Sequence, residues 1–271
     1  MALFSASPDF LLSGVGMITG AASGIGKATA FAFADNGCTS LALLDLDVDI
    51  LREITGDIKK KYPRVKVIAY LCDISNEEMV VQAIEEIVHE FGRIDYAVNN
   101  AGIPGPSGLT ESLSTEDFQK VMGVNLLGTW MCQREEIKAM LKQEPWNSRK
   151  SRRNRGVIVN MASGGGLIEP DAEITPYTAT KHGVVGFTKS IAKDAVHYAP
   201  KNIRINAVCP GVVLTSLFGT AGEKRGDAGK MTPIGRPARP EEIADAIVFL
   251  SSEMSSYMTG VAMPIDGKRA D

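Results

Sequence analysis

The sequence has few side chains that could bind a metal ion or form disulfides. Its 271 residues include four cysteines and three histidines. The cysteines form no Cys-x-x-Cys pair and have no histidine at metal-ligand spacing; they are Cys38, Cys72, Cys132 and Cys209. We therefore expect no metal site, reduced thiols in the core and a cytoplasmic location, where thiols stay reduced.

The sequence also lacks a long apolar run and an excess of one charge. No apolar run approaches the roughly 20 residues of a membrane span. Residues 1–13, an apolar N-terminal extension, lack the basic region of a cleaved signal. The 29 Lys and Arg against 32 Asp and Glu leave a formal net charge of -3, which argues against a polyanion as the main partner. We expect neither a membrane nor a nucleic acid as partner.

The balanced charge has one local exception, a dense basic run from Arg149 to Arg155. Such a run can be a nuclear signal or an anion site. Sites for single-stranded nucleic acid interleave aromatic side chains with basic ones, and the flanks of this run show no such pattern. We favour a basic, solvated surface insertion over residues 143–155, between a helix and a strand, with DNA binding as the alternative.

Apolar runs and helical periodicity alternate along the chain. Strands are predicted over residues 15–19, 40–45, 65–71, 94–99, 157–160, 203–208 and 260–265, and helices over residues 25–35, 48–60, 76–90, 115–142, 177–197 and 240–250. Strands that alternate with helices form a parallel sheet with right-handed crossovers. We predict one α/β domain, residues 1–271, with a doubly wound, seven-stranded parallel sheet and helices on both faces.

A glycine-rich turn, residues 19–26, follows the first predicted strand and precedes the first helix. Glycines there allow a tight turn and close approach of a pyrophosphate to the helix N-terminus. Asp45 ends the second strand, 19 residues beyond Gly26, where a carboxylate can bind the adenosine ribose and repel a 2′-phosphate. We expect NAD in preference to NADP. The alternative is that Asp45 only caps the next turn.

Tyr177 and Lys181 lie four positions apart in a predicted helix, so their side chains share one face. An ammonium near a phenol favours the phenolate, which makes Tyr177 a candidate proton acceptor despite an ordinary pKa of about 10. Taken alone, such a tyrosine is usually a packed ring with its hydroxyl bonded.

These two motifs and several others, in the same order, resemble the short-chain dehydrogenase/reductase family over roughly residues 13–267. The others are Asn99-Asn100-Ala101-Gly102, Asn125 within Gly123-Val124-Asn125-Leu126, Ser163, Pro210-Gly211-Val212-Val213-Leu214-Thr215, and Gly235-Arg236 with Pro240-Glu241-Glu242-Ile243-Ala244. An ordered set is far more specific than any one member. The resemblance implies a Rossmann-like domain that transfers hydride between a nicotinamide cofactor and an alcohol or ketone.

The resemblance also implies four catalytic residues. Tyr177 would be the general base in oxidation and the acid in reduction, and Ser163 would orient the substrate oxygen. Lys181 would bind the nicotinamide ribose and, with the cationic ring of the oxidised cofactor, lower the pKa of Tyr177. Asn125, at a helix interruption, would hold a water of a proton relay; alone, it would more often be a satisfied core amide.

A larger set is implied to bind the cofactor. Asp73 and Ile74 would lie at the adenine, and Val213 and Thr215 would hold the carboxamide. The whole implied set is Gly20, Ser23, Gly24, Ile25, Gly26, Asp45, Asp73, Ile74, Asn100, Ala101, Gly102, Tyr177, Lys181, Pro210, Gly211, Val213 and Thr215. The family's usual assembly, a homotetramer packed through the Asn125 helix, the Tyr177 helix and the last strand, is expected here as well.

The sequence departs from the family pattern near the substrate serine. Ser163 precedes Tyr177 by fourteen residues, against a usual spacing nearer thirteen, and three glycines follow it. We therefore expect a remodelled loop over residues 164–175. Near the C-terminus, Lys268 replaces the family's second glycine, which could alter a subunit contact.

Substrate contacts are expected from the loops at the carboxyl ends of the strands. These loops, residues 103–109, 164–174 and 214–231, have few charges except in residues 222–230, which resemble a mobile lid; the whole lid is predicted over residues 214–236. No fixed arginine for an acidic substrate is evident in the three loops. We predict NAD-dependent oxidation of a hydrophobic secondary alcohol in lipid, terpenoid or secondary metabolism. The alternatives are a carbonyl reductase that uses NAD(P)H in the same site, and a cofactor-binding regulator without turnover.

Overall fold

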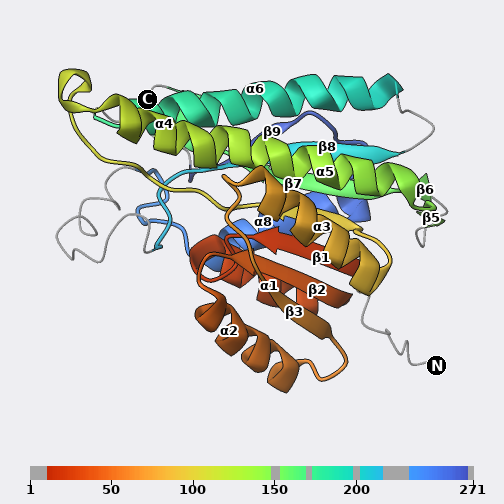
Figure 1. Cartoon of the computed structure of the whole chain (residues 1–271). Helices are drawn as coiled ribbons and strands as arrows, with labels where there is room; N and C mark the ends of the chain where they lie inside the picture. The colour runs from red at the N-terminus through yellow and green to blue at the C-terminus, as the bar shows by residue number, and fades with distance from the viewer. Residues whose placement is uncertain (1–10, 148–152, 169–172, 198–201, 216–231, 268–271) are drawn as a thin grey trace.

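A parallel sheet lies between two layers of helices (Figure 1). The structure, a computed structural model, describes residues 11–147, 153–168, 173–197, 202–215 and 232–267. The sheet has seven strands in the order β3-β2-β1-β4-β7-β8-β9, and every neighbouring pair is parallel. The strands are β1 (Gly14–Thr19), β2 (Cys38–Asp45), β3 (Lys66–Leu71), β4 (Tyr96–Asn99), β7 (Gly156–Met161), β8 (Ile203–Pro210) and β9 (Ala262–Ile265). The predicted fold class is confirmed.

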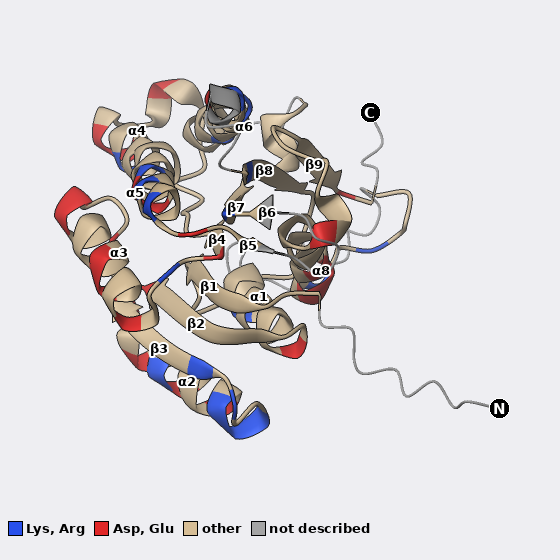
Figure 2. Cartoon of the chain, turned by 90° about the vertical axis from the view of Figure 1, so that its right-hand side faces the viewer, with Lys and Arg blue, Asp and Glu red and all other residues tan. Residues whose placement is uncertain are grey.

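The helices divide between the two faces of the sheet. Those on one face are α1 (Gly24–Asp35), α2 (Val48–Lys61) and α8 (Pro240–Ser251), and those on the other are α3 (Glu77–Phe91), α4 (Thr115–Met122), α5 (Thr129–Lys142) and α6 (Thr175–His197). Neighbouring strand residues point to opposite layers, so Ile18 packs in the first core and Met17 in the second. Acidic and basic residues lie mainly on the helices (Figure 2). None of the helices in the described ranges is long and apolar enough to cross a membrane.

Polar side chains cap the start of three helices. Asp47, Asn76 and Ser114 each accept a hydrogen bond from a backbone N–H in the first turn of the helix that follows. These bonds satisfy donors that have no partner within the helix. Pro240 opens α8, where its missing N–H costs nothing. Local sequence therefore sets where α2, α3, α4 and α8 begin.

The helix predicted over residues 115–142 is not continuous. A π-helical segment, Gly123–Gly128, separates α4 from α5. Close packing accompanies the change, because a Cβ on Gly128 would lie 2.8 Å from the carbonyl oxygen of Ile74. The wider segment turns Asn125 toward the loop after β4, and this agrees with the helix interruption expected at Asn125.

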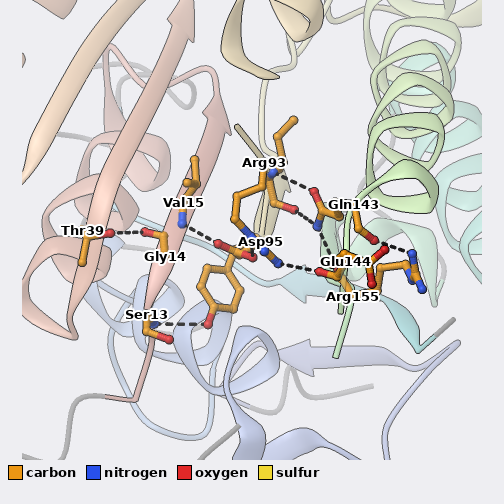
Figure 3. A network of polar contacts seen from close by, with 11 residues as sticks. Ser13, Gly14, Val15, Thr39, Arg93, Asp95, Gln143, Glu144 and Arg155 are labelled. Carbon is orange, nitrogen blue, oxygen red and sulfur yellow. Dashed lines mark hydrogen bonds and ion pairs between the residues drawn. The ribbon is translucent and has the colours of Figure 1, made fainter. Parts of the chain in front are cut away.

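The basic insertion begins and ends against the amino ends of the strands. The Gln143 amide accepts from the N–H of Ile94 at 3.1 Å, donates to the Ile94 carbonyl at 2.8 Å, and donates to the Arg155 carbonyl. Beside it, Asp95 binds the Arg93 guanidinium and the N–H of Val15 (Figure 3). A two-stranded antiparallel hairpin, β5 (Trp146–Asn147) and β6 (Arg153–Asn154), replaces the predicted loop. Residues 148–152, which include most of the basic run, lie outside the described residues.

A buried guanidinium holds the C-terminal end of α8. Arg204, on β8, donates to the carbonyls of Leu250, Ser251, Ser252 and Met258 and to the Ser255 hydroxyl. The last carbonyls of a helix have no partner within it, and a positive charge there also complements the helix dipole. Arg204 therefore joins the sheet, α8 and the short 3₁₀ turn Glu253–Ser255.

Replacing Arg204 should be costly. We expect Arg204→Met to lower the free energy of unfolding by about 2–4 kcal/mol, because several buried carbonyls lose a charged donor. Arg52→Met is the control, since Arg52 only pairs with Asp49 on an exposed face, and it should change the value by less than about 0.5 kcal/mol. Urea unfolding measures both. Equal losses in the two variants would contradict this role of Arg204.

Candidate active site

A cavity of about 990 Å³ opens at the carboxyl ends of the strands. This edge is where ligands bind in doubly wound sheets, because the loops after β1 and β4 leave in opposite directions. Every residue of the implied cofactor set except Gly26 lines the cavity, and so do Ser163, Tyr177 and Lys181 among the four implied catalytic residues. Gly26 and Asn125 lie behind its wall.

The glycine turn has no room for side chains at two positions. A Cβ on Gly26 would lie 2.1 Å from the Gly20 carbonyl oxygen, and one on Gly20, whose φ is +65°, would lie 2.7 Å from Cα of Ala101. Asn100 clamps the same turn, because its Nδ2 donates to the carbonyls of Thr19 at 3.1 Å and Gly20 at 3.0 Å. The glycine turn therefore presents backbone groups to the cavity, as a pyrophosphate site requires.

Asp45 has the turn-capping role that the sequence left as one of two alternatives, and its role at the ribose stays a prediction. One carboxylate oxygen accepts from the N–H of Ala22 at 2.9 Å and the other from the N–H of Leu46 at 2.7 Å. The carboxylate therefore caps the local turns and also lines the cavity. An ionised carboxylate has about four lone-pair positions, so acceptor capacity remains for ribose hydroxyls.

Lys181 is buried beside Tyr177, with 4% of its surface exposed. Its Nζ donates to the Met161 carbonyl at 2.8 Å and lies 5.4 Å from the centre of the Tyr177 ring. Burial lowers the pKa of Lys181 to about 8. This lysine is thus held by a backbone oxygen at the end of β7 and not by a carboxylate.

The expected lowering of the Tyr177 pKa requires both Lys181 and the cationic ring of the oxidised cofactor, and it stays a prediction; the protein side chains alone shift this pKa in the other direction. Burial raises the pKa of Tyr177, and the opposing influence is a hydrogen bond with Ser163. Desolvation penalises the phenolate more than the neighbouring groups stabilise it. A further cation in the cavity would be needed to bring the pKa down.

Ser163 reaches Tyr177 despite the unusual spacing. A 3₁₀ turn, Gly164–Gly166, takes up the glycines that follow it, and the Ser163 hydroxyl accepts from the N–H of Gly165 at 3.2 Å. The turn packs against α6, because a Cβ on Gly166 would lie 2.6 Å from the Lys181 carbonyl oxygen. This 3₁₀ turn lies within the loop that is predicted to be remodelled, and the remodelling itself stays a prediction; residues 169–172 lie outside the described ranges.

The Asn125 side chain is fully buried and bonded to protein. It accepts from the N–H of Ile103 and donates to the Ile103 carbonyl, each at 2.8 Å, and donates to the Thr180 hydroxyl at 3.4 Å. Its position is close to Lys181, since a Cβ on Gly102 would lie 3.1 Å from Asn125 Oδ1 and 3.7 Å from Lys181 Nζ. Asn125 therefore ties the loop after β4 to α6, as a satisfied core amide would; the water relay stays a prediction.

Some lining residues were not found from the sequence. The Met161 carbonyl holds Lys181, but a carbonyl is present at every residue and gives no sequence signal. Gln119 and Lys120 line the cavity from α4, one to two turns before Asn125, where helical spacing from Asn125 could have pointed to them. Most of the predicted lid, residues 216–231, lies outside the described ranges. No cluster of metal ligands occurs in the described parts of the chain.

Known proteins resemble the chain over nearly its whole length. The model of the enoyl-(acyl carrier protein) reductase family matches residues 20–267. The short-chain dehydrogenase fogB of Aspergillus ruber is 40% identical over 269 residues, which cover 94% of this chain and 96% of that protein. The cyclohexanol dehydrogenase of an Acinetobacter strain is 37% identical, with 93% of each chain covered.

Solved structures agree. Levodione reductase has a TM-score of 0.82 at 34% identity, with 94% of this chain and 96% of that chain covered. A 3-ketoacyl-(acyl-carrier-protein) reductase from Brucella melitensis, complexed with NADH, has a TM-score of 0.81 at 33% identity, with 95% and 98% covered. This chain belongs to the short-chain dehydrogenase/reductase family, and it is an NAD(P)-dependent oxidoreductase that acts on CH–OH groups.

Proposed function

We propose that the enzyme uses NAD to oxidise a hydrophobic secondary alcohol to a ketone. The observation that carries this proposal is one cavity with Asp45 on its wall and the Ser163–Tyr177 pair beside buried Lys181. Gly20 and Gly26, which have no room for a Cβ, fit a pyrophosphate at the turn between β1 and α1. A nicotinamide cofactor bound there supplies the hydride acceptor.

Ser163, Tyr177 and Lys181 have different roles in the proton transfer. Ser163 donates to or accepts from the substrate oxygen and sets its position against the Tyr177 hydroxyl. Tyr177 takes the alcohol proton as the base, and it returns a proton when the reaction runs as a reduction. The ammonium of Lys181, 5.4 Å from the centre of the Tyr177 ring, adds positive charge beside the phenolate that forms.

Several apolar residues line the cavity, which supports a hydrophobic substrate. They include Ile103, Pro104, Met161 and Ala162. The names of two relatives, cyclohexanol dehydrogenase and levodione reductase, are consistent with a cyclic alcohol or ketone. We place the reaction in lipid, terpenoid or secondary metabolism and the enzyme in the cytoplasm.

Reduction of a ketone is the second candidate. One site catalyses both directions, and relatives named as 3-oxoacyl-[acyl-carrier-protein] reductases, such as the one of Thermotoga maritima at 39% identity, favour it. A regulator without turnover is the third, and the presence of Ser163, Tyr177 and Lys181 in one cavity argues against it.

Tyr177→Phe separates an enzyme from a cofactor-binding regulator. We expect turnover with hydrophobic secondary alcohols to fall by about 10²–10⁴-fold, because the proton acceptor is lost. NADH binding, followed by fluorescence titration, should change little. Tyr257→Phe, which removes a hydroxyl from a fully exposed ring, is the control. Unchanged turnover in Tyr177→Phe would contradict the mechanism.

Asp45→Asn tests the preference for NAD. The amide keeps an acceptor oxygen for neighbouring N–H groups and removes the charge that repels a 2′-phosphate. We expect the ratio of kcat/KM with NAD to that with NADP to fall at least about tenfold, which corresponds to about 1.4 kcal/mol. Asp47→Asn removes the same charge two residues away, at the start of α2, and should leave the ratio unchanged. A wild-type enzyme that is faster with NADP would refute the preference itself.

We also propose a homotetramer that packs through α4, α5, α6 and β9. Apolar side chains on the outer surface of the α4–α5 region support it: Phe118, Leu127 and Trp130 are 37%, 51% and 36% exposed. Light scattering should give about four times the chain mass of 29.0 kDa. Leu127→Glu should reduce that mass, whereas Leu11→Glu, at another exposed apolar position, should not. A wild-type monomer would exclude the assembly.

A further inference from the structure

A carboxyl group that has no part in the proposed chemistry is buried next to Asn99, the residue before the cavity-lining loop Asn100-Ala101-Gly102. Glu136, on α5, has no exposed surface. One of its oxygens, Oε2, accepts from Asn99 Nδ2 at 3.0 Å, and the other, Oε1, has no hydrogen-bond partner. In the described parts of the chain no salt bridge reaches it. The neighbouring Glu135, by contrast, pairs with Arg134 and Lys138 on the outer side of the helix.

Asn99 and Glu136 belong to a network that crosses four elements. Asn99, at the end of β4, donates through the same Nδ2 to Oδ1 of Asn160 on β7 at 3.1 Å. Asn160 Nδ2 then donates to Gln133 Oε1 on α5 at 2.5 Å and to Thr188 Oγ1 on α6 at 2.9 Å. Each of these residues has at most 2% of its surface exposed. The network thus connects the strands that lead to Asn100 and Ser163 with the helix that carries Tyr177.

The pattern of donors and acceptors does not fit an ionised Glu136. Both hydrogens of Asn99 Nδ2 are used, so the only atom that Asn99 can still offer is Oδ1, an acceptor without a partner. A carboxylate would add another acceptor beside it. A neutral acid has an O–H to donate, and with Asn99 it forms a reciprocal pair: amide N–H to acid C=O, and acid O–H to amide C=O. The pair satisfies two buried atoms that are otherwise without partners.

The charged and titratable groups around Glu136 agree with a neutral acid. Two of them are thiols: Cys132 on α5 interacts electrostatically with Glu136 and with Cys72, which follows β3. On α6 the buried cation Lys181 donates to the Met161 carbonyl, and on α3 the ion pair of Glu77 with Arg134 is on the outer surface. Burial raises the pKa of Glu136 to about 8, against a partly opposing hydrogen bond from Asn99.

We propose that Glu136 is a positioning residue carried as the neutral acid, and that its hydroxyl donates to Asn99 Oδ1 and so fixes the loop Asn100-Ala101-Gly102. Asn99 immediately precedes this loop, which lines the cavity. The proposal rests on the proposed cofactor role of that loop. Loss of the proton would break the pair and place an unpaired charge in the core beneath it, which is costly.

Glu136→Gln is the central variant, because an amide forms the same reciprocal pair without a titrating proton. Infrared spectra of the folded protein at pH 7 should show the C=O stretch of a protonated carboxyl in the wild type and in the control Glu85→Gln, whose parent side chain is exposed on α3. The band should be missing in Glu136→Gln. A wild type without this band, or a band that Glu136→Gln retains, would overturn the proposal; neither readout needs a substrate.

Thermal unfolding at different pH values tests whether the proton on Glu136 stabilises the fold. The folded-state pKa lies above that of an exposed glutamate, about 4.3, so the stability of the neutral pair is complete below about pH 4 and is lost as the pH rises to about 8. The Tm of the wild type minus that of Glu136→Gln should therefore fall by several degrees between pH 5 and pH 8 and then level. Glu85→Gln should follow the wild type throughout. A constant difference would mean that Glu136 does not titrate in this range.

NADH binding separates positioning from stability alone. At pH 7 the Kd of Glu136→Gln for NADH should stay within about twofold of the wild-type value. Titration of Lys181 and Tyr177 can change NADH binding in both proteins alike. Above pH 8 the wild type should lose affinity beyond that shared change, and Glu136→Gln should not. Glu136→Leu, which forms no pair, should bind NADH about tenfold more weakly at every pH and leave kcat at saturating cofactor less affected. If Glu136→Leu binds NADH like the wild type, Glu136 does not position the loop.

Discussion

The hydrogen bonds from the Asn100 side chain to the carbonyls of Thr19 and Gly20 hold β1 and β4 together where their chains part. The strand order turns at β1: β2 and β3 lie on one side of it and β4 on the other. The loops that follow β1 and β4 therefore leave toward opposite faces and open a crevice between them. Without this clamp, the two walls of the cavity would not have a fixed separation. The clamp adds to the backbone pairing of β1 with β4 and holds the glycine turn against the loop after β4.

Much of the fold could be predicted because parallel strands are buried on both faces. Each residue of β4 and β7 is buried, so apart from Asn99 and Asn160 these strands are largely apolar runs in the sequence, and polar residues such as Asp47 and Asn76 stand where helices start. The hairpin of β5 and β6 was missed because two-residue strands give no periodic signal. The π-helical segment was indicated only through the family resemblance, since its form depends on packing against Ile74.

The sequence predicted which residues form the site better than it predicted how their pKa values shift. The ordered motifs pointed to Ser163, Tyr177 and Lys181, which share one cavity in the structure. The direction in which the pKa of Tyr177 shifts depends on burial, which the sequence does not give. The two interpretations of Asp45 were posed as alternatives, and one carboxylate has enough lone pairs for both. Glu136 gave no signal at all: a glutamate on an amphipathic helix is usually solvated, and only the packed structure shows that it faces the sheet.

The anchoring of the basic hairpin also bears on how the protein could be handled as a reagent. Gln143 and Arg155 close the base of the hairpin at the amino ends of β4 and β7, while the cavity lies at the carboxyl ends of the same parallel strands. A group attached at Glu144, which is exposed beside Gln143, would therefore lie on the side away from the cavity. Immobilisation through such a group would present the open side of the crevice to solution.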